Sequence, residues 1–175
     1  MDSLQGRSTD TVKKIISLLV ALVLSAPAFA ANLKPFDGPT PALKVQGLDG
    51  KTYDLNDYKG KVVLVQFWAT YCGPCRKEMP SMNKLLKSFD GKPFDILAVD
   101  MGENQEEVQA FVNEIKPEFT ILMDPEGEAI AAWNAFAVPA NFIIDKTGKI
   151  RYTLFGGTDW AAPEIAEMIT ALIDE

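Results

Sequence analysis

The chain of 175 residues contains no histidine and only two cysteines, Cys72 and Cys75. Histidine is the commonest metal ligand and the usual general base near neutral pH, so its absence removes both roles at once. A closed zinc site takes more ligands than two cysteines alone supply. We therefore expect no metal centre in this protein.

Positive charge is scarce and scattered along the chain. Lysine and arginine number 17 against 24 acidic residues, and the net charge is −7. An acidic surface gains nothing from counterion release on nucleic acid and is repelled by anionic membrane faces. Nucleic acid is therefore not an expected partner. A hydrophobic content of 47% is typical of a folded globular domain.

Residues 1–30 have the features of an export signal. Basic residues precede an apolar run at 15–26, and Ala28-Phe29-Ala30 provides the small-x-small pattern that predicts cleavage before Ala31. An uncleaved anchor is the alternative, because Ile15–Leu33 is uncharged and long enough to span a bilayer. Either way, the folded part is expected outside the cytoplasm, in a bacterial periplasm or tethered to the outer face of the inner membrane.

The rest of the sequence predicts one α/β domain at 42–175, after an extended, proline-rich lead-in at 31–41. Alternation around Asp49-Gly50 predicts a β-hairpin at 43–55. The apolar, valine-rich segment 61–68 is typical of a central strand buried on both faces. Further strands are predicted at 94–99, 119–124, 140–145 and 149–155, and helices at 73–89, around 108–115, 127–136 and 160–174. This order predicts a mixed sheet with helices on both faces.

The two cysteines form the motif C-G-P-C between the strand at 61–68 and the helix at 73–89. A disulfide across so short a ring removes little entropy from the unfolded chain, so it is a poor structural staple. Pro74 suits a first helical turn, and a helix N-terminus stabilises a thiolate on Cys72. The placement therefore favours thiol–disulfide chemistry over a structural disulfide or half of a metal site.

The stretch "FWATYCGPCRKEMP" (67–80) resembles the thioredoxin superfamily, most closely the exported TlpA/ResA-type thiol–disulfide oxidoreductases with an AhpC/TSA–redoxin-like thioredoxin domain. The segments "LAVDMGE" (97–103) and "AVPANFIIDKTGKI" (137–150) are similar to the same group. The resemblance covers 38–175. It implies a three-layer α/β/α sandwich whose mixed central sheet carries an N-terminal β-hairpin and an inserted βα element.

The resemblance also implies catalytic roles for the motif. Cys72 would attack the substrate disulfide, and Cys75 would resolve the mixed disulfide. Gly73 and Pro74 would hold the geometry of the ring. No cofactor is implied beyond the redox-active Cys72–Cys75 disulfide itself.

Substrate contacts are implied around the two cysteines. Trp68 would pack beneath the site, and Tyr71 stands where the family more often has a second tryptophan. Pro139 matches the family's cis-proline, which would aim the backbone of Val138 at the sulfurs for pairing with a substrate strand. The alternative for Pro139 is an ordinary proline at the start of a strand.

One departure from the family concerns the proton of the resolving thiol. Thioredoxins carry a buried aspartate six residues before the first cysteine, and this chain has Gln66 there, which cannot titrate. Glu103 is the first candidate for the missing acid. Asp100 and Glu78 are weaker candidates, and Glu78 is expected on the solvent face of its helix.

The motif suggests the direction of electron flow. Gly-Pro between the cysteines resembles thioredoxin, at about −270 mV, and not the strong oxidant DsbA, at about −120 mV. The resemblance implies a reductant of protein disulfides, for example in cytochrome c maturation, recharged by a membrane thiol-transfer reductase. A monomer is expected, because nothing in the sequence suggests a dimerisation segment. A thiol oxidant or isomerase is the alternative.

Two further functions are alternatives to this one. A peroxiredoxin-like peroxidase has the pattern P-x-x-x-T-x-x-C, but Val65 and Ala69 occupy the proline and threonine places. A non-enzymatic peptide-binding module could use apolar surface near Trp68, Tyr71 and Val138 without any exchange of disulfides.

Overall fold

The computed structural model describes residues 33–175, so the predicted export signal at 1–30 lies outside the described residues. The strands are β1 (Lys34–Pro35), β2 (Lys44–Gly47), β3 (Thr52–Asp54), β4 (Val62–Trp68), β5 (Phe94–Met101), β6 (Thr120–Asp124), β7 (Ala140–Ile144) and β8 (Ile150–Phe155). The helices are η1 (Leu55–Tyr58), α2 (Gly73–Ser88), α3 (Gln105–Ile115), α4 (Glu128–Ala132) and α5 (Pro163–Asp174). Within 33–175, none of these helices has the length and apolar character needed to cross a membrane.

All the strands form one mixed sheet in the order β1-β8-β7-β4-β5-β6-β2-β3. The β4, β5 and β6 strands are parallel neighbours, whereas β7 pairs antiparallel with β4. Every residue of β4 is buried, as its unbroken apolar pattern predicts. The expected hairpins are also present as the antiparallel pairs β2–β3 and β7–β8.

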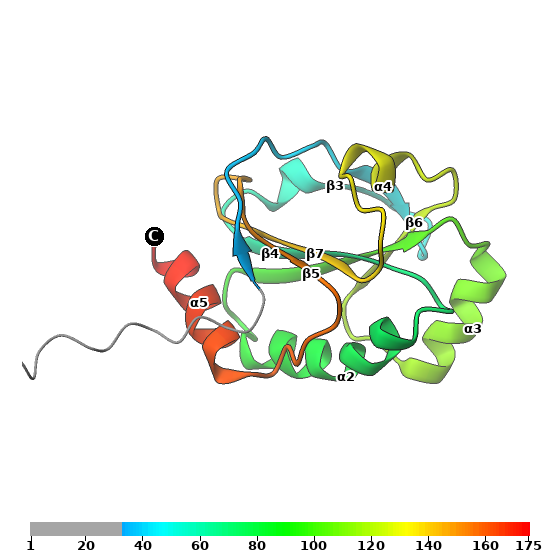
Figure 1. Cartoon of the computed structure of the whole chain (residues 1–175). Helices are drawn as coiled ribbons and strands as arrows, with labels where there is room; N and C mark the ends of the chain where they lie inside the picture. The colour runs from blue at the N-terminus through cyan, green and yellow to red at the C-terminus, as the bar shows by residue number, and fades with distance from the viewer. Residues whose placement is uncertain (1–32) are drawn as a thin grey trace, which may run out of the picture.

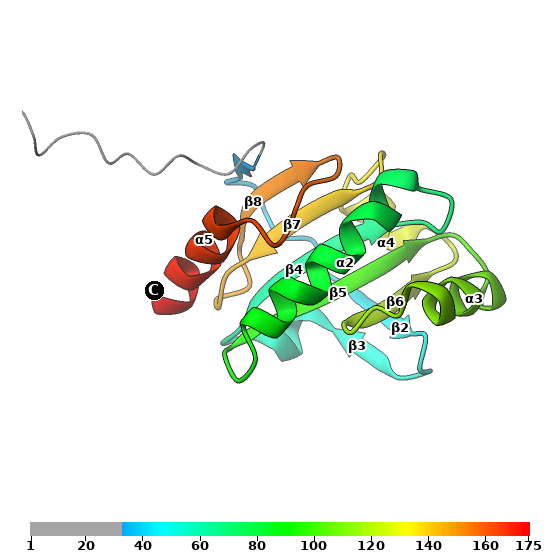
Figure 2. The ribbon, with the colours of Figure 1, turned by 90° about the horizontal axis from the view of Figure 1, so that it is seen from below.

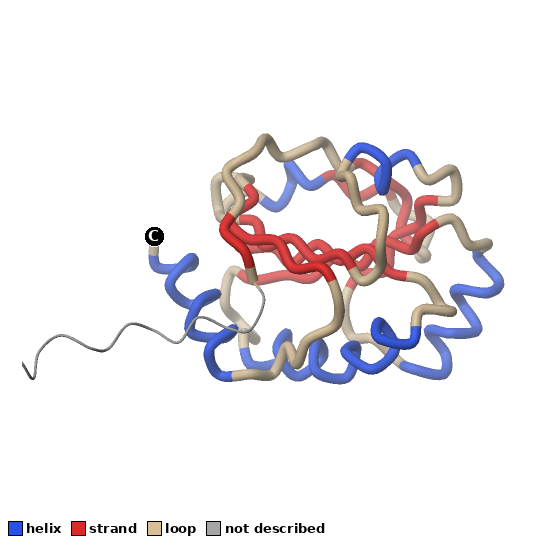
Figure 3. The backbone as a smooth tube through the Cα atoms, in the orientation of Figure 1, coloured by secondary structure: helices blue, strands red, loops and turns tan. Residues whose placement is uncertain are grey.

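Helices cover both faces of the sheet, which confirms the predicted three-layer architecture. In Figure 1, α2, α3 and α5 lie below the sheet and α4 lies above it. Figure 2 shows α2 crossing β4 and β5, with α5 and α3 to either side. The sheet separates two cores, one with Trp68, both cysteines and Ile169, the other with Phe67 and Phe142. Figure 3 shows the strands as a single layer between the helices.

The lead-in was predicted to be extended, and the structure shows that part of it belongs to the sheet. Lys34 and Pro35 pair with β8, at the sheet edge opposite β3. Beyond this short strand, the Lys149 ammonium lies 2.7 Å from Asp37, and Thr40 Oγ1 accepts a hydrogen bond from the backbone N–H of Ile150. The lead-in is therefore fixed to the β7–β8 hairpin.

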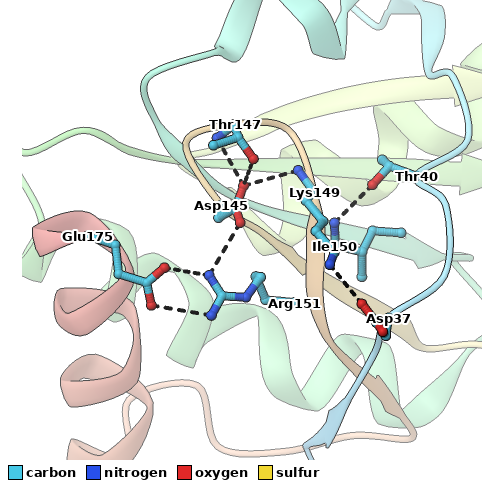
Figure 4. Close-up of polar contacts among 8 residues, drawn as sticks. All are labelled: Asp37, Thr40, Asp145, Thr147, Lys149, Ile150, Arg151 and Glu175. Atoms are coloured by element: carbon cyan, nitrogen blue, oxygen red, sulfur yellow. Dashed lines mark hydrogen bonds and ion pairs between the residues drawn. The ribbon is translucent and has the colours of Figure 1, made fainter.

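A carboxylate organises the turn of that hairpin (Figure 4). Asp145 Oδ1 accepts hydrogen bonds from the backbone N–H groups of Thr147 and Lys149, and its Oδ2 lies 3.3 Å from Arg151. Arg151 also lies 2.5 Å from Glu175, just after α5. Partial burial raises the pKa of Asp145, but the hydrogen bonds from Thr147, Lys149 and Arg151 together outweigh it and lower that pKa. The turn thus attaches the end of the chain to the sheet.

One predicted helix is shorter than expected. The segment 127–136 was predicted to be helical throughout, but α4 ends at Ala132. Asn134 adopts a left-handed backbone with φ 51°, which ends a right-handed helix, and asparagine tolerates this conformation better than most residues. The chain therefore leaves α4 early and runs as an irregular segment to Pro139.

Candidate functional site

Cys72 and Cys75 form a disulfide at the beginning of α2, with their Cα atoms 5.3 Å apart. Cys72 is the N-cap residue, and its sulfur accepts a hydrogen bond from the backbone N–H of Cys75 at 3.2 Å. Cys72 keeps 6% of its surface exposed, whereas Cys75 keeps none. Because free N–H groups at a helix N-terminus stabilise negative charge, the reduced pair would place its thiolate on the more accessible Cys72.

Trp68 supports the disulfide from within the core. It has no exposed surface, and its ring lies 4.8 Å from that of Phe111 in α3. Arg76 covers the Phe111 ring at 4.8 Å and pairs with Glu114 at 2.6 Å. Trp68 therefore lies in the interior and cannot itself contact a bound chain, whereas Tyr71, which is 68% exposed, can.

The Val138–Pro139 peptide bond is cis, as the resemblance predicted. Phe67 pairs with Ala140, so Pro139 lies beside the end of β4 from which the cysteine loop departs. The carbonyl of Pro139 accepts a hydrogen bond from the N–H of Gly156 at 2.9 Å. The strand ends of β4, β7 and β8 thus meet at the edge of the sheet that carries the disulfide.

Two apolar residues at this edge were not predicted from the sequence. Among residues 33–175, the large hydrophobic side chains with high exposure are Tyr71, Phe136 at 80% and Phe155 at 54%. Phe136 precedes Val138, and Phe155 pairs in register with Ala140. No periodicity distinguishes them from core phenylalanines, but their places beside the C-G-P-C and Val-Pro motifs could have identified them.

Glu103 contacts the loop before the cysteines. Its carboxylate accepts hydrogen bonds from the backbone N–H and the hydroxyl of Thr70. Its own N–H donates to Asp100 Oδ1 at 3.1 Å. The first candidate for the missing acid therefore holds the loop leading to Cys72, and no hydrogen bond joins it to Cys75.

Asp100, a second candidate, ends up in the interior. It has no exposed surface, and its Oδ2 has no hydrogen-bond partner among the described residues. Burial, together with the neighbouring Glu103, raises the pKa of Asp100 well above its ordinary value. Asp100 and Glu103 form one carboxylate pair behind Thr70.

The structure corrects the expectation for Glu78, which was predicted to face solvent. Glu78 is only 3% exposed, because α2 turns Cys75, Glu78, Met79 and Met82 toward the sheet. Its Oε1 accepts from Gln66 Nε2 at 2.5 Å, and its Oε2 from Thr158 N at 3.1 Å and Trp160 Nε1 at 3.3 Å. The carboxylate that bonds to Gln66 is therefore one of the two that the sequence made weaker candidates than Glu103.

Burial dominates the chemistry of Glu78. Desolvation raises the pKa of its carboxyl from 4.5 to about 7, although hydrogen bonds from Thr158, Trp160 and Gln66 act in the opposite direction. Glu78 follows Cys75 by three residues on α2, which places both side chains on one helix face. A carboxyl with this proton affinity can both accept and release a proton near neutral pH.

A cavity of about 250 Å³ connects this region to the surface. It lies between α2 and the β8–α5 connection and is lined by Pro74, Lys77, Glu78, Ser81, Gly157, Thr158 and Asp159. A proton on Glu78 therefore has a route to solvent that does not pass through the disulfide. Among residues 33–175, no group of three or more acidic or cysteine side chains is arranged to hold a metal ion.

Curated relatives of the chain carry the name thiol-disulfide oxidoreductase ResA. The protein of Bacillus thuringiensis (strain Al Hakam) is 36% identical over 143 residues, covering 81% of this chain and 83% of the relative. The protein of Bacillus subtilis (strain 168) is 33% identical over 110 residues, covering 63% of this chain and 62% of the relative. The chain spans 64% of the length of two Bacillus relatives that it matches at 40% identity.

Solved structures confirm the thioredoxin-like fold. The thiol:disulfide interchange protein DsbE from Chlorobium tepidum has a TM-score of 0.72 at 28% identity, covering 80% of this chain and 98% of that chain. A thioredoxin from Neisseria meningitidis has a TM-score of 0.70 at 29% identity, covering 79% and 93%. The profile of the AhpC/TSA family matches residues 37–153, and the chain belongs to this family.

Proposed function

We propose that this protein is an exported thiol–disulfide oxidoreductase that reduces disulfides in other proteins. The observation that carries the proposal is the difference in exposure between Cys72 and Cys75. Cys72 caps a helix and retains exposed surface, whereas Cys75 is fully buried, three residues before a buried carboxyl. The ResA and DsbE names of similar proteins support the same chemistry.

The first half of the reaction uses Cys72. In the reduced protein, the Cys72 thiolate attacks one sulfur of the substrate disulfide and forms a mixed disulfide. The second substrate sulfur leaves as a thiolate. The exposed rings of Tyr71 and Phe136 would contact the substrate chain on either side of the attacked bond. The backbone of Val138 would pair with that chain.

The second half uses Cys75 and Glu78. The Cys75 thiol passes its proton to the Glu78 carboxylate, and the resulting thiolate attacks Cys72 Sγ. This attack breaks the mixed disulfide and leaves the Cys72–Cys75 disulfide. The remaining substrate sulfur departs as a thiolate, and both substrate thiolates take up protons from solvent. Glu78 then releases the proton through the adjoining cavity. Two electrons have moved from the protein to the substrate.

The oxidised protein must regain two electrons before it can act again. In an oxidising compartment, this requires a donor outside the chain, and we infer a membrane thiol-transfer reductase. We propose the periplasm as the compartment and apocytochrome c as the first substrate to examine. The protein is expected to act as a monomer.

Trapping partners with Cys75→Ser tests the proposal. This variant keeps the attacking Cys72 and lacks the resolving thiol, so it should accumulate mixed disulfides that disappear on treatment with dithiothreitol. The matched control is Cys72→Ser, which should trap far less. Equal noncovalent capture by both variants would instead favour a peptide-binding module, and rapid consumption of hydrogen peroxide would favour a peroxidase.

A further inference from the structure

Gln66 is the only polar residue of β4, and it lies fully buried under α2. Its Nε2 donates two hydrogen bonds, one to Glu78 Oε1 at 2.5 Å and one to Asn141 Oδ1 at 3.3 Å. Its Oε1 is buried without a partner. A side-chain amide in this position contributes donors to its neighbours and leaves its acceptor unused.

Asn141 lies directly opposite Gln66 in the β4–β7 pairing and is equally buried. Its Nδ2 donates to the carbonyl oxygens of Leu154 and Gly156, at 3.3 and 3.5 Å. The adjacent N–H of Gly156 donates to the carbonyl of Pro139. A buried chain of hydrogen bonds thus runs from Glu78 through two side-chain amides to the strand ends beside the cis-proline.

The backbone fixes the direction of this chain. Carbonyl oxygens can only accept, so Asn141 must turn its NH₂ group toward Leu154 and Gly156. Its Oδ1 must then face Gln66, which obliges Gln66 to present its own NH₂ group. One N–H of that group donates to Asn141 Oδ1, and the other points at Glu78 Oε1. Neither amide can rotate by half a turn without bringing two acceptors together.

We propose that Asn141 and Gln66 act together as positioning residues: by holding an N–H donor on Glu78, they keep it ready to accept the proton of Cys75. The proposal rests on the proposed function and adds to it the residues that tune its proton acceptor. The amide at Gln66 would then serve a purpose that an ionisable side chain there would not, because it favours the ionised form of Glu78 without adding a second charge.

The other groups around Glu78 do not replace this donor. Thr158 N and Trp160 Nε1 bind the second oxygen, Oε2. Lys77 and Asp159, the charged residues that line the adjoining cavity, have exposed side chains of opposite sign. Oε1 receives a hydrogen bond from Gln66 alone among the described residues. Without the Gln66 donor, one of the hydrogen bonds that lower the Glu78 pKa would be lost. Burial would then raise that pKa further, and Glu78 would hold its proton more tightly.

The test is a carboxyl-carbon NMR titration of Glu78 in the oxidised protein, where the cysteines do not titrate. Gln66→Met removes the donor and the unpaired acceptor at similar volume. It should displace the Glu78 midpoint upward by at least about one pH unit, a tenfold change in proton affinity. Asn141→Leu should displace it in the same direction, because it frees the amide of Gln66 to rotate. Thr153→Val changes a buried polar residue of β8 that takes no part in these hydrogen bonds, so it should leave the Glu78 midpoint unchanged.

The double variant gives the sharpest result. Asn141 acts only through Gln66, so adding Asn141→Leu to Gln66→Met should move the midpoint no further. Additive displacements, or no displacement in Asn141→Leu alone, would overturn the proposal. The unaltered protein offers a second test: the Gln66 side-chain amide protons should shift with the midpoint of Glu78, and an absence of that response would also refute it. None of these readouts uses a substrate, so they stand apart from the trapping test of the proposed function.

Discussion

Replacing Glu78 by glutamine is expected to change how the stability of the oxidised protein depends on pH. In the folded protein, burial raises the pKa of Glu78 from 4.5 to about 7. At about 1.4 kcal/mol per pH unit, this difference amounts to about 3 kcal/mol of folding free energy. Glutamine has nearly the same shape and carries no ionisable proton, so this contribution disappears in the variant.

The sign follows from the direction of the pKa change. Below 4.5, Glu78 is protonated in both the folded and unfolded states and costs nothing. As the pH rises toward 7, the unfolded chain ionises while the folded protein resists, so the unfolding free energy falls, and above 7 it levels off. The glutamine amide meets the Nε2 donor of Gln66, which adds a pH-independent cost of about 1 kcal/mol. Relative to the unaltered protein, Glu78→Gln should therefore gain stability between about pH 4 and about pH 8.

Urea unfolding followed by far-ultraviolet circular dichroism measures this difference directly. Across that range, the difference between the unfolding free energies of the two oxidised proteins should change by about 3 kcal/mol in favour of Glu78→Gln. Glu167→Gln, an exposed change on α5, serves as the control. Its unfolding free energy, plotted against pH, should run parallel to that of the unaltered protein. Parallel curves for Glu78→Gln would show that the carboxyl is not held at a raised pKa, and the proton transfer assigned to it would lose its basis.

Further predictions concern the disulfide, its surroundings and the chain ends. Equilibration with glutathione or dithiothreitol should give a reduction potential well below about −200 mV, and a value near about −120 mV would reverse the assigned direction. Phe136→Ala should leave the unfolding free energy nearly unchanged, since this side chain is 80% exposed, but raise KM for a disulfide-bonded peptide. Thr70→Val removes the hydroxyl bonded to Glu103 and should cost about 1 kcal/mol in urea unfolding. Arg151→Ala should cost about 1 kcal/mol, with a smaller effect at high salt, because Arg151 and its partner Glu175 are partly exposed and the buried Asp145 keeps its hydrogen bonds from the Thr147 and Lys149 N–H groups.

The layers of the fold followed from hydrophobic periodicity. The unbroken apolar run of β4 predicted a strand buried on both faces, and the stripe of apolar residues on α2 predicted the helix. The pairing of β1 was not predictable, because a proline-rich pair of residues carries no strand pattern. The early end of α4 depends on a single left-handed residue, Asn134, which helical spacing does not show.

The cysteines and the cis-proline were predictable because their signals are local. The burial of Glu78 was not, because it depends on Thr158 and Trp160, which lie 80 or more residues away in the sequence. A glutamate on an amphipathic helix is ordinarily solvent-exposed, and only the β8–α5 connection folding over α2 reverses that expectation. Gln66 was recognised as a departure from the family, but its bond to Glu78 required the three-dimensional structure.

The placement of the three tryptophans gives the protein its own optical reporters. Trp68 shares a core cluster with Cys72 and Cys75, so its emission should brighten when the quenching disulfide is reduced. Trp160 donates its indole N–H to Glu78, and its spectrum should follow the protonation of that carboxyl. Trp133 lies in the core on the opposite face of the sheet and provides an internal reference. Electron transfer and proton transfer could therefore be timed separately in single-tryptophan variants, without attaching any dye.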